Sequence, residues 1–135
     1  MNPTHLALAM LGGALGAGLR YWLGAALLQK FGSGLPWGTL AANLAGSFLA
    51  GLLFASLAQR GALGDALRAL LIIGVMGGLT TYSALMLELM AFQRGGQPER
   101  ALGYLALTLV AGLALVWLGL RVGEALRGPV PPSLG

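Results

Sequence analysis

Residues 74–83 read Gly-Val-Met-Gly-Gly-Leu-Thr-Thr-Tyr-Ser and lie inside an uncharged segment that extends from Ala69 to Leu87. A helix of about 20 residues crosses the roughly 30 Å of a bilayer's hydrocarbon core. The centre of this segment, however, combines glycines with a run of hydroxyl-bearing residues. Glycine is a poor helix former, and Ser and Thr hydroxyls compete for backbone groups. We therefore expect a broken third helix near mid-membrane, whose free carbonyls line a polar cavity or ion site. A close helix crossing through small residues is the alternative.

The composition places the chain in a membrane. Of its 135 residues 57% are hydrophobic and 9% are charged, whereas soluble domains carry about 25% charged residues. The chain has no cysteine, which excludes disulfides and thiolate metal sites. Its net charge of +4 comes without a basic cluster interleaved with aromatic residues, so nothing favours nucleic-acid binding. The N-terminus lacks the basic region of a cleavable signal peptide, so we expect the first apolar segment to be a span.

Four long apolar segments predict an all-α membrane protein with a single four-helix transmembrane domain over residues 1–128. Each segment is close to the roughly 20 residues that a spanning helix needs. The links between them are short and contain glycine or proline, which are turn signals. The expected helices cover about residues 4–29, 36–59, 66–93 and 98–126, and an irregular tail covers 129–135.

Basic residues divide almost evenly between the two ends of the expected helices. The side that carries the N-terminus, side A, holds Arg60, Arg68, Arg121 and Arg127; side B holds Lys30, Arg94 and Arg100, with Arg20 in the adjoining half of the first helix. An excess of Lys and Arg on one side normally fixes a single topology. The near balance predicts insertion in both orientations and an antiparallel, dual-topology homodimer. One fixed topology is the alternative.

Polar residues inside the spans gather in the half of the membrane next to side B. In the second helix Thr39, Asn43 and Ser47 recur every four residues and therefore share one face. The third and fourth helices add further polar side chains in that half, namely Tyr82, Ser83, Glu88, Tyr104 and Thr108. One chain thus offers a polar path across half a membrane, and an antiparallel partner would supply the other half.

Three motifs in this order and spacing resemble the Fluc (CrcB) fluoride channels over essentially the whole chain. They are Gly12-Gly13-x-x-Gly16-Ala17-x-x-Arg20-Tyr21, then Gly38-Thr39-Leu40-x-x-Asn43-x-x-Gly46-Ser47, then Gly77-Gly78-x-Thr80-Thr81-Tyr82-Ser83 followed by Glu88. The resemblance implies an antiparallel dimer of four-helix subunits in the bacterial plasma (inner) membrane. It also implies two fluoride pores, which export cytoplasmic fluoride.

The same resemblance implies a structural sodium ion at the dimer centre, held by the backbone carbonyls of Gly77 and Thr80. It makes Asn43 a pore-facing amide. Tyr82 and Leu85 occupy the positions of the family's two pore phenylalanines, and both depart from that pattern. Tyr82 keeps an aromatic ring and Leu85 does not. Altered conductance, or a role as one subunit of a heterodimer, is therefore the alternative to an ordinary homodimeric channel.

Fluoride is strongly hydrated, and burying a bare charge is costly, so a pore must supply replacement hydrogen bonds. The amide of Asn43 offers two donors, and the ring edge of Tyr82 is electropositive. Further donors are expected from the hydroxyls of Thr39, Ser47, Ser83 and Thr108. For Asn43 the alternative is an interhelical hydrogen bond, and for Ser47 and Thr108 it is ordinary helix packing.

Two charged residues need their own explanation. Arg20 is the one charge deep in a span, where charges are expensive; it either attracts the anion or bonds backbone carbonyls. Glu88 would repel fluoride inside a pore and is expected near the membrane edge, where it pairs with an arginine or caps a helix. Tyr104 is expected to line a vestibule.

Other function classes fit less well. A proton-coupled multidrug or guanidinium transporter needs a carboxylate inside the membrane, and the only candidate, Glu88, is at a helix end. A non-transporting assembly protein would not need the polar half-path. The sequence holds no recognisable nucleophile–base pair or metal cluster, so we do not expect an enzyme.

Overall fold

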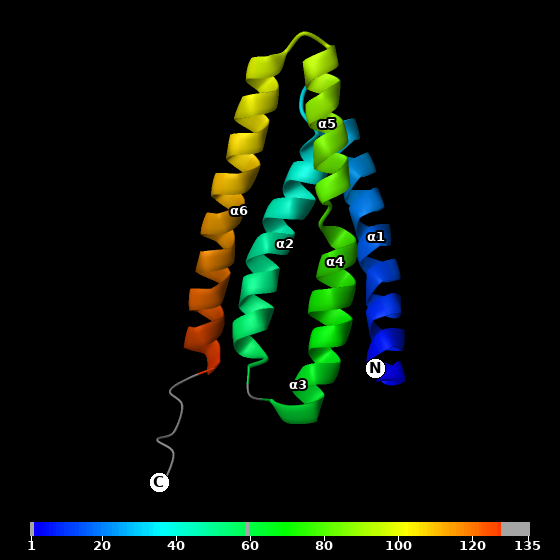
Figure 1. Cartoon of the computed structure of the whole chain (residues 1–135), viewed down its shortest axis with the longest axis vertical. Helices are drawn as coiled ribbons and strands as arrows, with labels where there is room; N and C mark the ends of the chain where they lie inside the picture. The colour runs from blue at the N-terminus through cyan, green and yellow to red at the C-terminus, as the bar shows by residue number, and fades with distance from the viewer. Residues whose placement is uncertain (1, 59, 128–135) are drawn as a thin grey trace.

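A computed structural model describes residues 2–58 and 60–127, and this part of the chain is entirely helical apart from short links (Figure 1). The helices are α1 (Pro3–Phe31), α2 (Trp37–Ser56), α3 (Gly61–Leu67), the π-helix η1 (Arg68–Met76), α4 (Gly77–Leu79), α5 (Tyr82–Arg94) and α6 (Pro98–Arg127). Four helical stretches are long and apolar enough to cross a membrane, and the third is the composite Gly61–Arg94. The predicted four-span architecture is confirmed, and the expected tail over 129–135 lies outside the described residues.

Helix boundaries differ from the prediction around the link between the second and third spans. Helix α2 ends at Ser56 rather than at residue 59, and the guanidinium of Arg60 donates from Nε to the Ser56 carbonyl at 3.0 Å. Gly61 follows with φ +58°, a conformation that favours glycine, so the chain reverses there. The next helix begins at Gly61 rather than at residue 66. It includes Gly64, whose buried backbone packs against Leu57.

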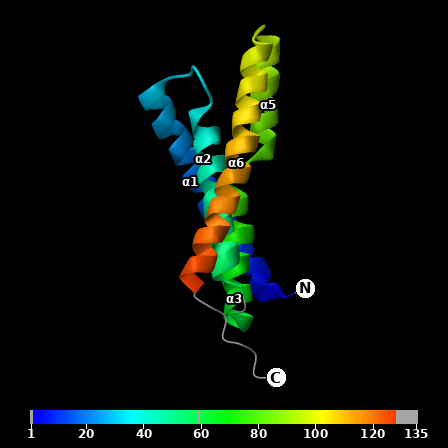
Figure 2. The same ribbon diagram turned by 90° about the vertical axis from the view of Figure 1, so that its left-hand side faces the viewer.

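The helices run side by side, and the chain reverses direction between successive spans, whereas α4 continues into α5 in the same direction (Figure 1). Helix α2 packs along α6, α1 packs along η1 and α4, and α5 packs on α6. Figure 2, a view turned by 90°, shows that the α1–α2 pair diverges from the α5–α6 pair towards the upper end of the molecule. The composite third span therefore contacts α1 through its first half and α6 through its second half.

Glycine pairs make a close crossing between α1 and the third span. Gly12 and Gly16 of α1 face the backbone of η1 and α4, and a Cβ at either position would collide with a carbonyl oxygen. On the opposite helix, the backbones of Gly74 and Gly78 contact the backbone of α1. Small residues let helix backbones approach in lipid, where the hydrophobic effect gives no net drive. This crossing fixes the composite third span against α1.

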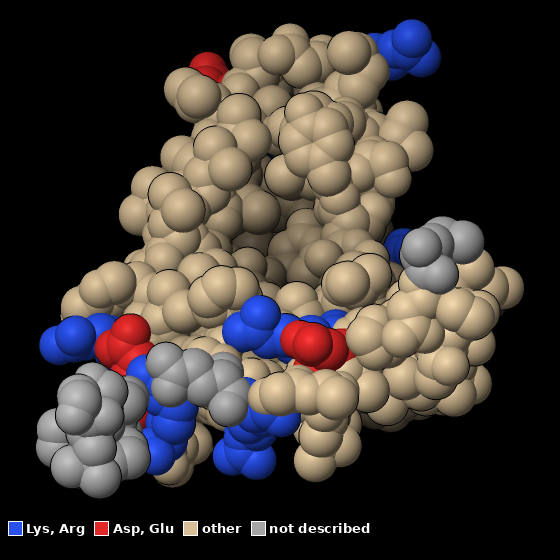
Figure 3. Space-filling model, turned by 60° about the horizontal axis from the view of Figure 1, so that its bottom comes forward, with Lys and Arg blue, Asp and Glu red and all other residues tan. Residues whose placement is uncertain are grey.

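Charged side chains mark the end of the molecule that carries the N-terminus and α3. Figure 3 shows Lys and Arg there together with Asp and Glu, below a surface almost free of charge. One of these charges is structural, since Arg68 donates from Nη2 to the Phe54 carbonyl at 3.3 Å and lies over the Phe54 ring. With Arg60, it places two cations at the negative C-terminal end of α2, where the helix dipole favours them.

Candidate functional site

Two residues in extended conformation separate α4 from α5. Thr80 has φ −79° and ψ 151°, and Thr81 has φ −149° and ψ 118°. The Thr80 amide still donates to the Met76 carbonyl at 2.9 Å, which completes the last turn before the interruption. Thr81 then caps the next helix, because its hydroxyl accepts from the Ala84 amide at 3.2 Å. A helix end of this kind leaves carbonyl groups without their ordinary partners.

The side chain of Asn43 replaces part of the missing backbone ladder. The Thr81 amide donates to Asn43 Oδ1 at 2.7 Å, and Asn43 Nδ2 donates to the Thr81 carbonyl at 3.1 Å. The interhelical hydrogen bond that the sequence left open as an alternative is thus present. Since an amide NH₂ carries two hydrogens, Asn43 keeps one donor beyond this pair. Gly46, one turn further along α2, has no Cβ and so admits the Thr80 methyl group.

Arg20 reaches the interruption from the opposite side. Its Nε donates to the Gly78 carbonyl at 3.1 Å, so the one deep cation of α1 satisfies one of the freed carbonyls. In the described part of the chain, no hydrogen-bond donor pairs with the carbonyls of Gly77 or Thr80, because the Thr81 and Ala84 amides bond elsewhere. The carbonyl oxygens of Gly77 and Thr80 are therefore available to a ligand.

A cavity of about 520 Å³ lies beside the interruption, between α2, α6 and the composite third span. Its wall includes Asn43, Ser47, Gly77, Thr80, Tyr82, Leu85 and Thr108. Tyr82 and Leu85, where the resemblance implies phenylalanines, differ in burial, since Tyr82 is 75% exposed and Leu85 only 4%. Leu85 packs with Leu40 and Tyr104 in the core, whereas the ring of Tyr82 stands free of its own chain.

Two hydroxyls of the cavity wall already have acceptors on their own helices. Ser47 donates to the Asn43 carbonyl at 2.7 Å, and Thr108 donates to the Tyr104 carbonyl at 2.8 Å. Such bonds to the carbonyl four residues earlier are ordinary for Ser and Thr in helices. A role as donors to an anion would require these hydroxyls to rotate. Ser83 is exposed, and its oxygen lies 3.4 Å from that of Thr81.

A second polar cluster joins three helices on side B of the cavity. Glu88 of α5 accepts from the Thr39 hydroxyl of α2 through Oε1 and from the Tyr104 hydroxyl of α6, at 2.8 Å, through Oε2. Tyr104 is 3% exposed, and the Phe92 ring meets it edge-on at 6.0 Å between centroids. Glu88 thus pairs with hydroxyls rather than with an arginine, so both of its oxygens are satisfied without a cation.

The residues predicted for the site thus fall into two groups, one outlying contact and one exposed residue, Ser83, that belongs to neither group. Asn43, Ser47, Gly77, Thr80, Tyr82, Leu85 and Thr108 share the cavity; Thr39, Glu88 and Tyr104 form the second cluster; Arg20 bonds the interruption from α1. Sequence reasoning gave no individual role to Thr81, although its backbone is the partner of Asn43. The sequence feature that could have identified Thr81 is its position in the run of hydroxyl residues, directly before the apolar residues of α5.

Comparisons with known proteins agree on one family. A family model described as CrcB-like protein, Camphor Resistance (CrcB), matches residues 7–120. Relatives named fluoride-specific ion channel FluC include one from Xanthomonas euvesicatoria pv. vesicatoria (strain 85-10), 57% identical over 120 residues that cover 89% of this chain and 90% of the relative. A FluC from Xylella fastidiosa (strain 9a5c) is 53% identical over 87% of this chain and 82% of its own length.

A FluC from Thermus thermophilus is 48% identical over 128 residues, which cover 95% of this chain and all of the relative. The match to the family model contains all the helices except the ends of the first and last. Together with the four spanning helices, these similarities identify a multi-pass membrane protein. The chain belongs to the CrcB-like family, among relatives named for fluoride-specific ion conduction.

Proposed function

We propose that the protein is a passive, fluoride-selective channel that exports cytoplasmic fluoride across the plasma (inner) membrane. The observation that carries this proposal is the identity of up to 57% to proteins named fluoride-specific ion channel FluC, over a match that contains the whole cavity wall. Conduction makes and breaks no covalent bond, so the protein is not an enzyme. Neutral hydrogen fluoride enters cells and ionises inside, and the trapped anion leaves down an inside-negative potential.

The cavity supplies the chemistry that a small anion needs. Asn43 is fixed by the Thr81 backbone and keeps one amide hydrogen, which is a donor of defined position. Tyr82 contributes an electropositive ring edge and a hydroxyl, and its exposed side chain is free to meet an ion or a second chain. Leu85 adds only an apolar surface. On the side-B end the path leads towards the hydroxyls that hold Glu88.

We propose that two oppositely inserted copies form a homodimer with two pores. The cavity is bounded by α2, α6 and the third span of a single chain, and Tyr82 projects from that chain almost uncovered. A second, antiparallel copy would close the cavity and extend the polar half-path through the other half of the membrane. A heterodimer remains the alternative for a chain that carries leucine at position 85.

We also propose a structural sodium ion at the dimer centre, bound by the carbonyls of Gly77 and Thr80. The residues fit such an ion, because both oxygens lack a hydrogen-bond donor among the described residues and lie near mid-span. The adjacent Gly78 carbonyl accepts a hydrogen bond from Arg20 instead, and this bond holds the interruption in place. Two copies related by two-fold symmetry would present two sets of oxygens. The bound cation would also favour anions in the nearby cavity.

The competing function is a proton-coupled transporter of the multidrug or guanidinium class. Such a transporter needs a carboxylate that exchanges protons, whereas both oxygens of Glu88 accept hydrogen bonds from Thr39 and Tyr104. The test is efflux from liposomes loaded with potassium fluoride. A channel releases fluoride when valinomycin allows potassium to follow, and an imposed pH gradient does not change the rate in excess of that from protein-free liposomes. Efflux that needs the pH gradient and ignores valinomycin would reject the channel.

A further inference from the structure

Two more cavities open at the side-B end of the molecule, beyond the cluster of Glu88 and Tyr104. One, of about 400 Å³, is lined by Glu88, Phe92, Gln97 and Arg100 together with the α1–α2 link. The other, of about 480 Å³, is lined by Tyr104, Trp37 and again Arg100. Glu88 lines the first cavity and Tyr104 the second, and Tyr104 donates to Glu88, so one hydrogen bond connects the two walls. Arg100 is the basic residue common to both walls.

Arg100 forms no ion pair with a carboxylate of the described residues. Its Nη1 donates to Gln97 Oε1 at 2.9 Å, which orients the guanidinium with a neutral partner. Among residues 2–58 and 60–127, the carboxylates form a single ion pair, between Arg121 and Glu124. Glu88, by contrast, presents negative charge to the first of these cavities. Arg100 therefore offsets the charge that would otherwise repel an anion on its way to the polar cluster.

We propose that Arg100 recruits monovalent inorganic anions at the side-B mouth of the ion path and so sets the rate of fluoride entry. The inference rests on the proposed channel function. An exposed cation at a mouth raises the local anion concentration by long-range attraction, and salt screens that attraction. The Debye length falls from about 30 Å at 0.01 M to about 3 Å at 1 M, so the contribution of Arg100 should vanish at high salt.

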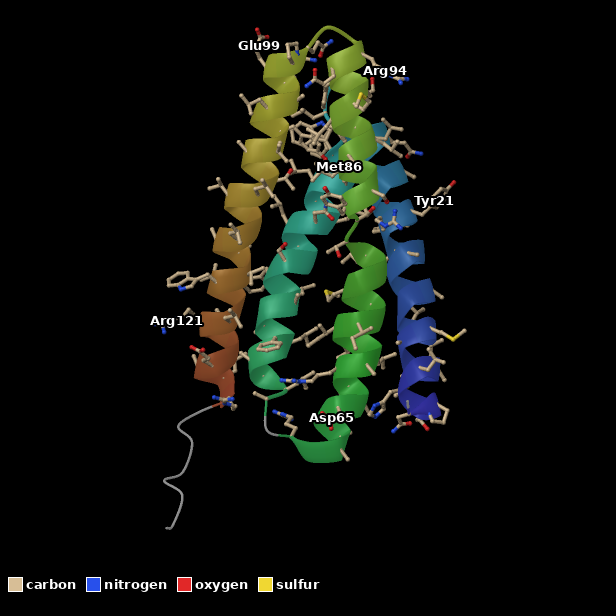
Figure 4. All side chains as sticks on the ribbon, in the orientation of Figure 1. Tyr21, Asp65, Met86, Arg94, Glu99 and Arg121 are labelled. Atoms are coloured by element: carbon tan, nitrogen blue, oxygen red, sulfur yellow. The ribbon has the colours of Figure 1, made fainter. Side chains whose placement is uncertain are left out.

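The test compares initial rates of fluoride efflux at low and high concentrations of an impermeant salt. Arg100→Gln is expected to lower the low-salt rate about two- to fivefold and to match wild type at high salt. Arg100→Lys keeps the charge and should keep both rates. The matched control is Arg94→Gln, which removes an exposed cation at the same end of the molecule, where Arg94 points outward from α5 (Figure 4). Arg94 lines neither cavity, so its removal should lower the low-salt rate clearly less than Arg100→Gln does.

Four results would overturn the inference. Arg100→Gln with wild-type rates at both salts would remove Arg100 from the path. An equal loss at both salts would indicate a structural effect, and so would a loss in Arg100→Lys. The same salt-dependent loss in Arg94→Gln would indicate a general surface-charge effect. Failure of the proposed function is distinguishable, because then wild type itself would release no fluoride at either salt.

Discussion

Asn43 and Thr81 exchange two hydrogen bonds between a side-chain amide and a backbone peptide. The Thr81 amide donates to Asn43 Oδ1 at 2.7 Å, and Asn43 Nδ2 donates back to the Thr81 carbonyl at 3.1 Å. In this way α2 satisfies both polar groups of a residue that has left the helical ladder. Asn43 thus has two tasks in the proposed channel, since it holds the interruption open and offers its remaining hydrogen to the cavity.

Asn43→Ala should destabilise the protein as well as reduce conduction. It leaves the donor and the acceptor of Thr81 without partners, and each unsatisfied buried group costs about 1–3 kcal/mol. Thermal unfolding in detergent measures the loss. Ser56→Ala is the matched control, because it also removes an α2 side-chain hydrogen bond, to the Leu52 carbonyl, away from the cavity. Equal unfolding temperatures for the two variants would contradict the supporting role of Asn43.

Gly16→Ala should weaken the crossing between α1 and the third span. The new methyl group would meet the Val75 carbonyl, and forcing the helices apart costs about 1–3 kcal/mol. Gly18 lies on the same helix with no atom within 4 Å of an added Cβ. Gly18→Ala should therefore be neutral or stabilising by up to about 1 kcal/mol, from helix propensity alone. If denaturation gave the two variants the same stability, the close crossing would be wrong.

Leu85→Phe introduces the aromatic residue that the resemblance implies at this position, yet it should destabilise this chain. Leu85 is 4% exposed and packs against Leu40 and Tyr104, so a larger ring must displace them at a cost of about 1–3 kcal/mol. Tyr82→Phe should leave stability unchanged, since the Tyr82 side chain is exposed. Unfolding of both variants checks this contrast, and a Leu85→Phe protein as stable as wild type would show that the core has room for the ring.

Removal of sodium should loosen the dimer. If the carbonyls of Gly77 and Thr80 bind the ion, replacing sodium by a large organic cation leaves these oxygens unpaired near mid-membrane, where unsatisfied groups are costly. The expected result is a lower dimer fraction in light scattering and slower fluoride efflux, both restored by sodium. Unchanged dimerisation and full efflux without sodium would argue against the ion.

Much of the architecture could be predicted from sequence, because lipid imposes simple rules. Apolar segments of about 20 residues, uncharged except for Arg20 in the first, predicted the four spans, and the four helices able to span are confirmed. The first and last helices end within two residues of the prediction, at Pro3–Phe31 and Pro98–Arg127. The predicted end of α2 and the predicted start of the next helix were wrong, since both depend on where Arg60 caps α2 and on the close packing of Gly64. The π-helix η1 had no local signal.

The site was predictable only as a set of residues. The spacing of Thr39, Asn43 and Ser47 placed them on one face, but not their partners on other helices. The pairing of Thr39 and Tyr104 with Glu88 depends on how three helices rotate about their axes. The bond from Arg20 to the Gly78 carbonyl likewise needs the interruption as a whole. The ion-binding roles of these residues stay predictions.

Parallel fluoride and chloride efflux from liposomes that contain the purified protein tests the central claim most directly. A fluoride-selective channel should release fluoride rapidly when valinomycin carries the counter-current, and should release chloride no faster than protein-free liposomes. Asn43→Ala, measured beside Ser56→Ala, should lose fluoride release while the control keeps it. Equal release of both anions, or no fluoride release from intact wild-type dimers, would contradict the account.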